Sequence, residues 1–187
     1  GWVRQLVEEF EQQAADDFAS FDEDDRPPWT YSLDVGYNIA RNDEAMFVVD
    51  IGESTYTGGA HPNHGSITFN FLMPDAWQVY LPEIFDPLAV DRISELAIAD
   101  LLEQWDAGDS MSDDDWLKTG AGPEWDNFRN FLLLPETLAI DFPPYQVAAY
   151  AAGPQHVEIP LAELEGLMRR DWRTPVPSFD CARASNP

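Results

Sequence analysis

The segment that most constrains the fold of this 187-residue chain is a glycine-histidine turn, residues 56–65, with the sequence YTGGAHPNHG. Two adjacent glycines, a proline and two histidines there separate two stretches with the period of a β-strand. Gly58 and Gly59 can adopt positive φ or let another chain approach closely, and Pro62 then stiffens the exit. The pattern therefore predicts a shaped turn between two long strands.

Strand-like patterns lie on both sides of this turn, where apolar residues alternate with polar or smaller ones. They predict strands over 29–40, 45–57 and 66–73, with a hairpin turn at Asn42-Asp43 between the first two and with Ile67, Phe69 and Phe71 on one face of the third. A short strand is expected within 77–85, and further strands are expected at 130–134, 138–142 and 157–159.

Helical spacing of apolar residues predicts a helix over 2–21, which the prolines of the following segment end. Pro87 suits a first helical position, and the helix it opens runs to about Trp105. The expected buried stripe of that helix is Leu88, Ile93, Leu96, Ala97, Leu101 and Leu102, and the tryptophans expected in the core are Trp29, Trp77 and Trp105. A closing helix is expected over 161–168. Because strands and helices mix without regular βαβ alternation, the sequence predicts an α+β fold, a largely antiparallel sheet packed with helices in a single layered domain.

Charge narrows the choice of partners. Thirty-five acidic residues face ten basic ones, a formal net charge of -25. Such a polyanion repels phosphate backbones and steers cationic proteins or metal ions toward itself, so we expect no nucleic-acid partner. The alternative is that the acidity only supports solubility. No run of about eighteen apolar residues is present, so we expect no transmembrane segment in this chain.

The three histidines raise the question of a metal site. His61, His64 and His156 can in principle ligate zinc, but their spacing is weak evidence for a site. The favoured interpretation is that a ring nitrogen of His61 fastens the loop to backbone carbonyls and that His64 is exposed. His61 could also be the base of an acyl-transfer site, but the sequence does not contain the G-x-S-x-G motif that would present the nucleophile. We therefore expect no cofactor and no metal, and we assign no catalytic residue.

The second unusual stretch is the tyrosine segment, residues 143–154, with the sequence PPYQVAAYAAGP. Tyr145 and Tyr150 flank small residues there, and tyrosine is favoured at binding surfaces because it contributes area and a hydroxyl at low entropy cost. The alternative is that both rings cover a sheet edge. We expect the turn and this segment to fold against a common sheet as a recognition surface. The candidate binding residues are Tyr56, Thr57, Gly58, Gly59, His61, Pro62, Asn63, Tyr145, Tyr150 and Gly153.

The sequences of the glycine-histidine turn and the tyrosine segment, with NFLLLPETLAIDF before the latter, resemble the C-terminal domain of the RsiV-type anti-sigma factors. That domain is of unknown function and is also attached to cell-wall deacetylases. The resemblance runs from roughly Trp29 to Leu167, and Ala149 stands where proline is common in that family. It suggests an N-terminal helix and acidic linker over 1–28 and an RsiV-like α+β domain over 29–170.

The only cysteine, Cys181, lies in PSFDCARASNP, which resembles the opening of an LprI-type lysozyme-inhibitor domain. That resemblance implies a disulfide with a later cysteine and an oxidising, extracytoplasmic compartment. Residues 171–187 are then a linker and the truncated start of a second domain.

Together the two resemblances imply a periplasmic or secreted bacterial binding module, with a lipid anchor in the full-length protein left open. The best-understood relative binds lysozyme as a sensor, and a chain of charge -25 associates quickly with such a cationic partner. We therefore expect a module that recognises or inhibits lysozyme, another cationic envelope protein or a cell-wall component. The alternatives are a peptidoglycan-acting hydrolase or deacetylase-associated domain, with His61 and a nearby carboxylate as acid and base, and a structural spacer domain. Whether the chain is an enzyme stays open.

Overall fold

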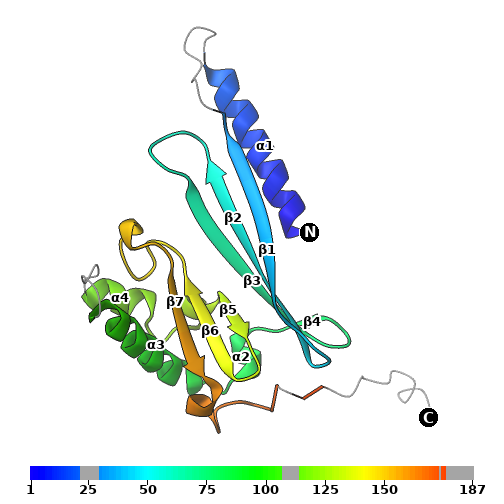
Figure 1. Ribbon diagram of the computed structural model, residues 1–187, viewed down its shortest axis with the longest axis vertical. Helices are drawn as coiled ribbons and strands as arrows, with labels where there is room; N and C mark the ends of the chain where they lie inside the picture. The colour runs from blue at the N-terminus through cyan, green and yellow to red at the C-terminus, as the bar shows by residue number, and fades with distance from the viewer. Residues whose placement is uncertain (22–29, 107–113, 173, 176–187) are drawn as a thin grey trace, which may run out of the picture. The chain divides into compact units, whose positions relative to one another are not determined.

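The computed structural model describes residues 1–21, 30–106, 114–172 and 174–175. The chain divides into two compact units, and each is described by itself (Figure 1). Unit 1 comprises Gly1–Tyr37 and Ile51–Ser66, and unit 2 comprises Asn38–Asp50 and Ile67–Pro187. The expected linker up to residue 28, Trp29 and the cysteine at 181 lie outside the described residues.

Unit 1 contains one helix and parts of three long strands. Their bounds are α1 (Trp2–Ser20), β1 (Ser32–Asn42), β2 (Met46–Tyr56) and β3 (Asn63–Leu72). The predicted helix over 2–21 and the first three predicted strands are therefore confirmed, although β3 begins three residues earlier than expected.

The helix α1 lies alongside β1 within unit 1 (Figure 1). The Phe18 ring lies 4.9 Å from the Tyr31 ring, and the Tyr31 hydroxyl donates to Asp17 Oδ2 at 3.1 Å. No residue of α1 is buried, and the side chains of Val3 and Val7 are exposed. The helix therefore covers its neighbour with a narrow stripe rather than a wide apolar face.

Unit 2 contains the main core and a second sheet. The first sheet has the order β1-β2-β3-β4, and the second has the order β5-β6-β7 with both pairs antiparallel. The strands not yet bounded are β4 (Trp77–Gln78), β5 (Phe131–Leu133), β6 (Thr137–Phe142) and β7 (Gln155–Pro160). The α+β class with antiparallel pairing is confirmed, while the strands form two sheets where one was expected.

The longest helix of unit 2 is α3 (Ala89–Asp106), which packs on β7. Its residues Ile93, Ala97 and Leu101 are fully buried, as the sequence predicts. Shorter elements complete the unit: α2 (Leu81–Ile84), α4 (Asp114–Gly120), η1 (Trp125–Phe128), η2 (Tyr150–Ala152) and η3 (Leu161–Leu164). The closing helix expected over 161–168 is only the 3₁₀ turn η3.

Three residues predicted to be buried are exposed. Leu88 is 70% exposed because α3 begins only at Ala89, so Leu88 stands before the helix and outside its stripe. Leu102 is 43% exposed because it follows Leu101 by one residue and therefore points away from the core-facing side. Trp77 is 65% exposed in the two-residue strand at the sheet edge.

The strand β3 buries its polar residues rather than the expected apolar face. Thr68 and Asn70 are buried, whereas Ile67, Phe69 and Phe71 are only partly buried. The cause is that these polar side chains bond to the backbone of the edge strand β5. Thr68 Oγ1 accepts from the Phe131 N–H, Asn70 Nδ2 donates to the Phe131 carbonyl, and Asn70 Oδ1 accepts from the Leu133 N–H, all at 2.8 to 2.9 Å.

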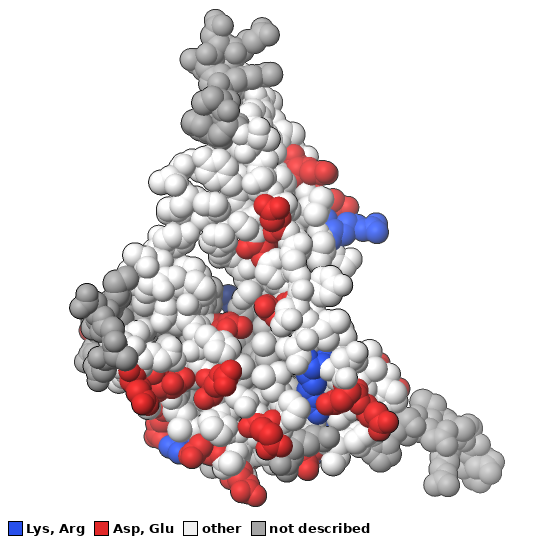
Figure 2. Space-filling model, viewed as in Figure 1, with Lys and Arg blue, Asp and Glu red and all other residues white. Residues whose placement is uncertain are grey.

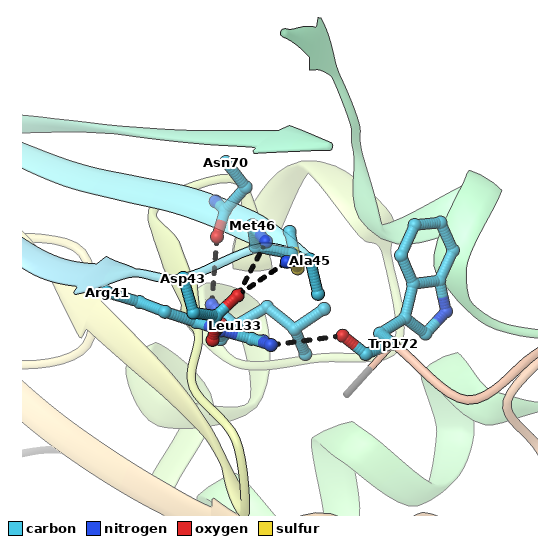
Figure 3. Close-up of polar contacts among 7 residues, drawn as sticks. All are labelled: Arg41, Asp43, Ala45, Met46, Asn70, Leu133 and Trp172. Atoms are coloured by element: carbon cyan, nitrogen blue, oxygen red, sulfur yellow. Dashed lines mark hydrogen bonds and ion pairs between the residues drawn. The ribbon is translucent and has the colours of Figure 1, made fainter. Parts of the chain in front are cut away.

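A buried arginine lies close to these contacts (Figure 3). Arg41 is 5% exposed, and its guanidinium donates to the carbonyls of Leu133 at 3.4 Å and Trp172 at 3.2 Å. Its Nε lies 2.6 Å from Asp43 Oδ2. The charge is thus paired and hydrogen-bonded, which is the condition under which a guanidinium can be buried without a large penalty.

Asp43 also forms the predicted hairpin turn between β1 and β2. Its Oδ1 accepts from the N–H groups of Ala45 and Met46, both at 2.8 Å (Figure 3). Burial raises the pKa of Asp43, but the hydrogen bonds from Arg41 and from these two backbone groups outweigh burial and hold the pKa below its ordinary value. A short polar side chain that bonds to its own turn explains why this position holds aspartate.

Candidate functional site

The glycine-histidine turn joins β2 to β3 and belongs to unit 1. Gly58 and Gly59 have φ values of +97° and +105°, so the expected positive φ is confirmed. The Tyr56 hydroxyl donates to the Gly59 carbonyl at 3.1 Å, and His61 Nδ1 lies 3.0 Å from the Pro62 carbonyl. The ring contact to a backbone carbonyl expected for His61 is thus present.

The remaining candidate residues of the turn lie at its tip and in the first residue of β3. Thr57 is partly buried, and the residues from 59 to 64 are all exposed, among them Pro62, Asn63 and His64. The hydrogen bond of Tyr56 and the ring contact of His61 join residues no more than three positions apart. In the described part of the chain, no three His, Cys, Asp or Glu residues are arranged to hold a metal ion.

The tyrosine segment joins β6 to β7 in unit 2. The Tyr145 side chain is 60% exposed, and its ring centroid lies 5.4 Å from that of the partly buried Tyr150. The φ of Tyr145 is +72°, a conformation that L-residues with bulky side chains rarely adopt. Such strain persists only where the surroundings hold the backbone in place, and it concentrates at functional sites.

Side-chain hydrogen bonds to neighbouring elements hold the first half of the segment. Trp116 Nε1 donates to the Tyr145 carbonyl at 2.8 Å. Gln146 Nε2 donates to the carbonyls of Gly120 and Asn127, both at 2.8 Å. The backbone that follows the Tyr145 Cα is therefore tied to α4 and η1.

The second half of the segment is held by Gln155, the first residue of β7. Its Nε2 donates to the carbonyls of Ala152 at 2.9 Å and Gly153 at 3.3 Å, while its Oε1 accepts from Trp105 Nε1 at 2.9 Å. Gly153 has a φ of +72°, so the glycine expected at this turn is required there. Trp105, predicted as a core residue, is partly buried and links the turn to α3.

Gly120 allows the segment to approach α4 closely. A Cβ at this position would lie 1.9 Å from the backbone oxygen of Gln146, a distance that real contacts do not show. No local pattern in the sequence predicted a role for this glycine. Glycine is required at position 120 because of Gln146, which lies 26 residues away along the chain, and no local sequence signal reveals this contact.

The expectation that the turn and the tyrosine segment share one sheet is wrong. The turn connects strands of the four-stranded sheet, and the tyrosine segment connects strands of the three-stranded sheet. They also belong to different units, so the ten candidate residues form two separate groups.

A histidine-carboxylate pair lies at the base of the tyrosine segment. Asp141 and His156 face each other across β6 and β7, and His156 Nδ1 lies 2.6 Å from Asp141 Oδ1. His156 Nε2 lies 3.5 Å from Glu158 Oε1. The hydrogen bond to Asp141 raises the pKa of His156 above its ordinary value, although burial acts in the opposite direction, and Glu158 adds to the rise.

A third carboxylate interacts with this pair. Burial raises the pKa of Asp50 in β2, and the negative charge of Asp141 raises it further. Asp50 Oδ1 is buried and has no hydrogen-bond partner within the described residues. In the alternative of a peptidoglycan-acting enzyme the expected acid-base histidine is His61, whereas the histidine with a carboxylate at hydrogen-bond distance is His156. Only the register of β6 against β7 brings the two residues together, so their sequence positions gave no signal.

Residues 82–162 match the model of a family described as a protein of unknown function, DUF3298. The matched range contains the tyrosine segment and the Asp141–His156 pair, and it leaves out the glycine-histidine turn. The fold resembles a crystal structure of a DUF3298 family member from Bacteroides fragilis, with a TM-score of 0.66, 18% identity and coverage of 91% of this chain and 68% of that one. A family member from Pseudomonas aeruginosa PAO1 gives a TM-score of 0.56 at 16% identity and covers 79% of this chain and 66% of that one.

Over 140 residues the chain is 28% identical to the peptidoglycan-N-acetylmuramic acid deacetylase PdaC of Bacillus subtilis (strain 168). The alignment covers 75% of this chain and 30% of that protein, so the chain spans under a third of its relative's length. These matches support a domain of the DUF3298 family. The finer resemblances to RsiV-type anti-sigma factors and to LprI-type inhibitors stay predictions.

Proposed function

We propose that this chain is a binding module of the bacterial cell envelope, that it acts outside the cytoplasm as a periplasmic or secreted domain, and that the tyrosine segment is its recognition surface. The observation that carries the proposal is the exposed Tyr145, held at positive φ and packed beside Tyr150. Side chains of Trp116, Gln146 and Gln155 fix the backbone of this segment before any partner arrives. A preorganised aromatic surface binds with less loss of conformational entropy.

The envelope setting is supported by the Bacillus subtilis relative, whose name describes an enzyme acting on peptidoglycan. Because the chain spans 30% of that protein, the proposal takes over the setting and not the deacetylase activity. Among the residues that the structure describes, no helix has both the length and the apolar character needed to cross a bilayer.

The partner that fits the charge is a cationic protein of the envelope environment, such as lysozyme. The chain carries a formal charge of -25, and Asp and Glu side chains are spread over the face shown in Figure 2. Opposite charge steers such a partner to the surface and makes association faster at low salt. The tyrosines then supply the apolar contact area that charge alone does not provide.

The test is calorimetric titration of the chain with lysozyme at low and high salt. We expect binding that weakens as salt rises, and we expect Tyr145→Ala to weaken it about 30-fold, the effect of an interface hot spot worth 2 kcal/mol. Tyr145→Gly removes the same ring and also relieves the strained φ, so it should bind as weakly while being more stable than Tyr145→Ala.

The matched control is Tyr37→Ala, which removes a tyrosine that is 75% exposed on β1. Its affinity for lysozyme should equal that of the unmodified chain. Undiminished binding by Tyr145→Ala, or equal losses for Tyr37→Ala and Tyr145→Ala, would rule out the tyrosine segment as the recognition surface.

A peptidoglycan-acting enzyme is the second candidate, and the Asp141–His156 pair is the observation that favours it. A histidine oriented by a carboxylate can act as a general base or acid. Release of products from muropeptides that is abolished in His156→Gln would support this candidate over the binding module. Silence in both assays would favour the third possibility, a spacer domain.

A further inference from the structure

A small pocket in unit 2 lies outside the tyrosine segment and the Asp141–His156 pair. It has a volume of about 250 Å³ and is formed where α2 meets η1. Its lining includes Tyr80, Pro82, Trp125, Asp126, Arg129 and Phe131. Pockets for drug-sized ligands measure roughly 300 to 1,000 Å³, so this one suits a ligand of about one ring.

The cation of this pocket is Arg129. Its side chain is exposed and forms no hydrogen bond or ion pair with any residue in the described ranges, in a chain with thirty-five acidic residues. By contrast, Arg92 pairs with Glu163 at 2.8 Å. A free guanidinium presents a planar set of donors that matches a carboxylate in two parallel hydrogen bonds. Arg129 is therefore available for an anionic group of a ligand.

Aromatic side chains form the walls of the pocket. Tyr80 is 55% exposed, and Trp125 is partly buried and packs against the core. The backbone of Tyr80 is fixed because its N–H donates to Glu83 Oε2 and its carbonyl accepts from the Glu83 N–H, both at 2.9 Å. On the η1 side, Asn127 Nδ2 donates to the carbonyl of Gly122 at 3.0 Å. The backbone on both sides of the pocket is thus held in place without a ligand.

We propose that this pocket binds a single hexosamine ring that carries a carboxylate. Tyr80 and Trp125 contact the C–H face of the ring, and Arg129 pairs with the carboxylate. Asp126 accepts a hydrogen bond from a hydroxyl or amide of the same ring. The site is distinct from the tyrosine segment, and the inference rests on the proposed envelope location only for the source of the sugar.

A peptide carboxylate is the main competing ligand, since Arg129 would bind it equally well. Two features favour a sugar. Aromatic walls around a space of one ring suit the flat apolar face of a pyranose, and an acceptor beside the cation suits a ligand that offers hydroxyl donors as well as an acid. An extended peptide terminus uses neither the aromatic faces nor the acceptor to the same extent.

The net charge gives this site a salt dependence opposite to that of a cationic partner. A charge of -25 repels an anionic sugar at long range, and salt screens that repulsion beyond a Debye length of about 8 Å at physiological ionic strength. The contact between Arg129 and the carboxylate is shorter than this distance and is less affected. Affinity for the sugar should therefore hold or rise with salt, while affinity for lysozyme falls.

The test titrates the chain with N-acetylmuramic acid and with N-acetylglucosamine, which lacks the carboxylate-bearing lactyl group. Binding is followed by NMR of the tryptophan indole N–H signals, with Trp125→Phe to assign the signal of the pocket. We expect N-acetylmuramic acid to bind about tenfold more tightly, as one charge-assisted hydrogen bond supplies, and to shift the Trp125 signal.

Arg129→Gln should reduce the affinity for N-acetylmuramic acid about tenfold, to the level of N-acetylglucosamine. The matched control is Arg92→Gln, which removes the same charge from an arginine that is already paired, and which should leave the affinity unchanged. Circular dichroism of both variants checks that the fold is intact.

Equal affinity for the two sugars, no effect of Arg129→Gln, or tighter binding of N-acetyl-D-alanine than of N-acetylmuramic acid would each overturn the proposal. The sugar pocket and the recognition surface can be ruled out independently of each other. Absent sugar binding with normal lysozyme binding removes only the pocket, whereas normal sugar binding with no Tyr145-dependent lysozyme binding removes only the recognition surface.

Discussion

The glycine-histidine turn and the tyrosine segment both connect neighbouring strands through glycines, but their backbones are held in different ways. The turn contains two glycines at positive φ, and a Cβ on Gly59 would meet no atom within 4 Å. The tyrosine segment needs Gly120 because the chains approach too closely for any side chain. A glycine can thus be required for its positive φ in one region and for close packing of two backbones in another. Only the close packing restrains the surrounding backbone.

Two glycine substitutions test this difference and should give the largest effect. Gly120→Ala places a methyl group 1.9 Å from the Gln146 backbone oxygen, so we expect a loss of about 3 kcal/mol or more in the free energy of unfolding. Gly59→Ala meets open space and loses only the cost of a positive φ, about 1 to 2 kcal/mol. Urea unfolding of both variants measures the two values. Equal losses would mean that α4 and the tyrosine segment can move apart without cost.

Side-chain donors provide the second test. Gln146→Ala leaves the carbonyls of Gly120 and Asn127 without this donor, so we expect a loss of about 1 to 3 kcal/mol. His61→Ala removes a contact at an exposed turn and should change stability by less than about 0.5 kcal/mol. Amide hydrogen exchange adds a local reading, because protection near Tyr145 should fall in the first variant. Unchanged exchange in Gln146→Ala would show that the segment does not depend on this clamp.

The smallest expected effect concerns pH. The folded pKa of His156 is raised above the ordinary 6.5, so its stabilising contribution is fully present below that pH and is lost as pH rises through the folded pKa. Because the pair is half exposed, we expect a change of about 0.5 kcal/mol. The pKa of Asp50 is also raised in the folded state, so its ionisation also lowers the stability as pH rises, but in a lower pH range than that of His156. The measurement is therefore the difference between the unmodified chain and His156→Gln from acidic to alkaline pH, and parallel curves would contradict the assignment.

Local patterns predicted most of the regular elements but not the contacts between them. The helix α1, the long strands and the buried residues Ile93, Ala97 and Leu101 follow from periodicity within one segment. Periodicity failed at β3, where Thr68 and Asn70 are buried because strand β5 provides backbone partners for them. A polar residue in a strand normally faces solvent. The sequence around Asn70 gives no sign that its hydrogen-bond partner lies some sixty residues away.

The candidate site shows the same limit. The turn-rich segment predicted around Tyr145, Tyr150 and Gly153 is present, because proline and glycine have strong local preferences, while the role of these residues in binding stays a prediction. The Asp141–His156 pair could not be predicted, because strand register depends on tertiary structure. A shift of the register by one residue would give every residue of β6 a different partner on β7. The pocket at Arg129 combines residues from positions 80 to 131, which no short motif contains.

The side chains of Thr68 and Asn70 also affect how readily another chain can pair with the three-stranded sheet. They bond to the Phe131 N–H and carbonyl and to the Leu133 N–H, and Arg41 donates to the Leu133 carbonyl, so these groups of β5 do not form an open edge of the three-stranded sheet. An open edge is a template on which another chain can add a strand, and it is a common starting point for aggregation and fibril growth. Here that edge is closed by side chains of the same molecule, which removes this template for strand addition.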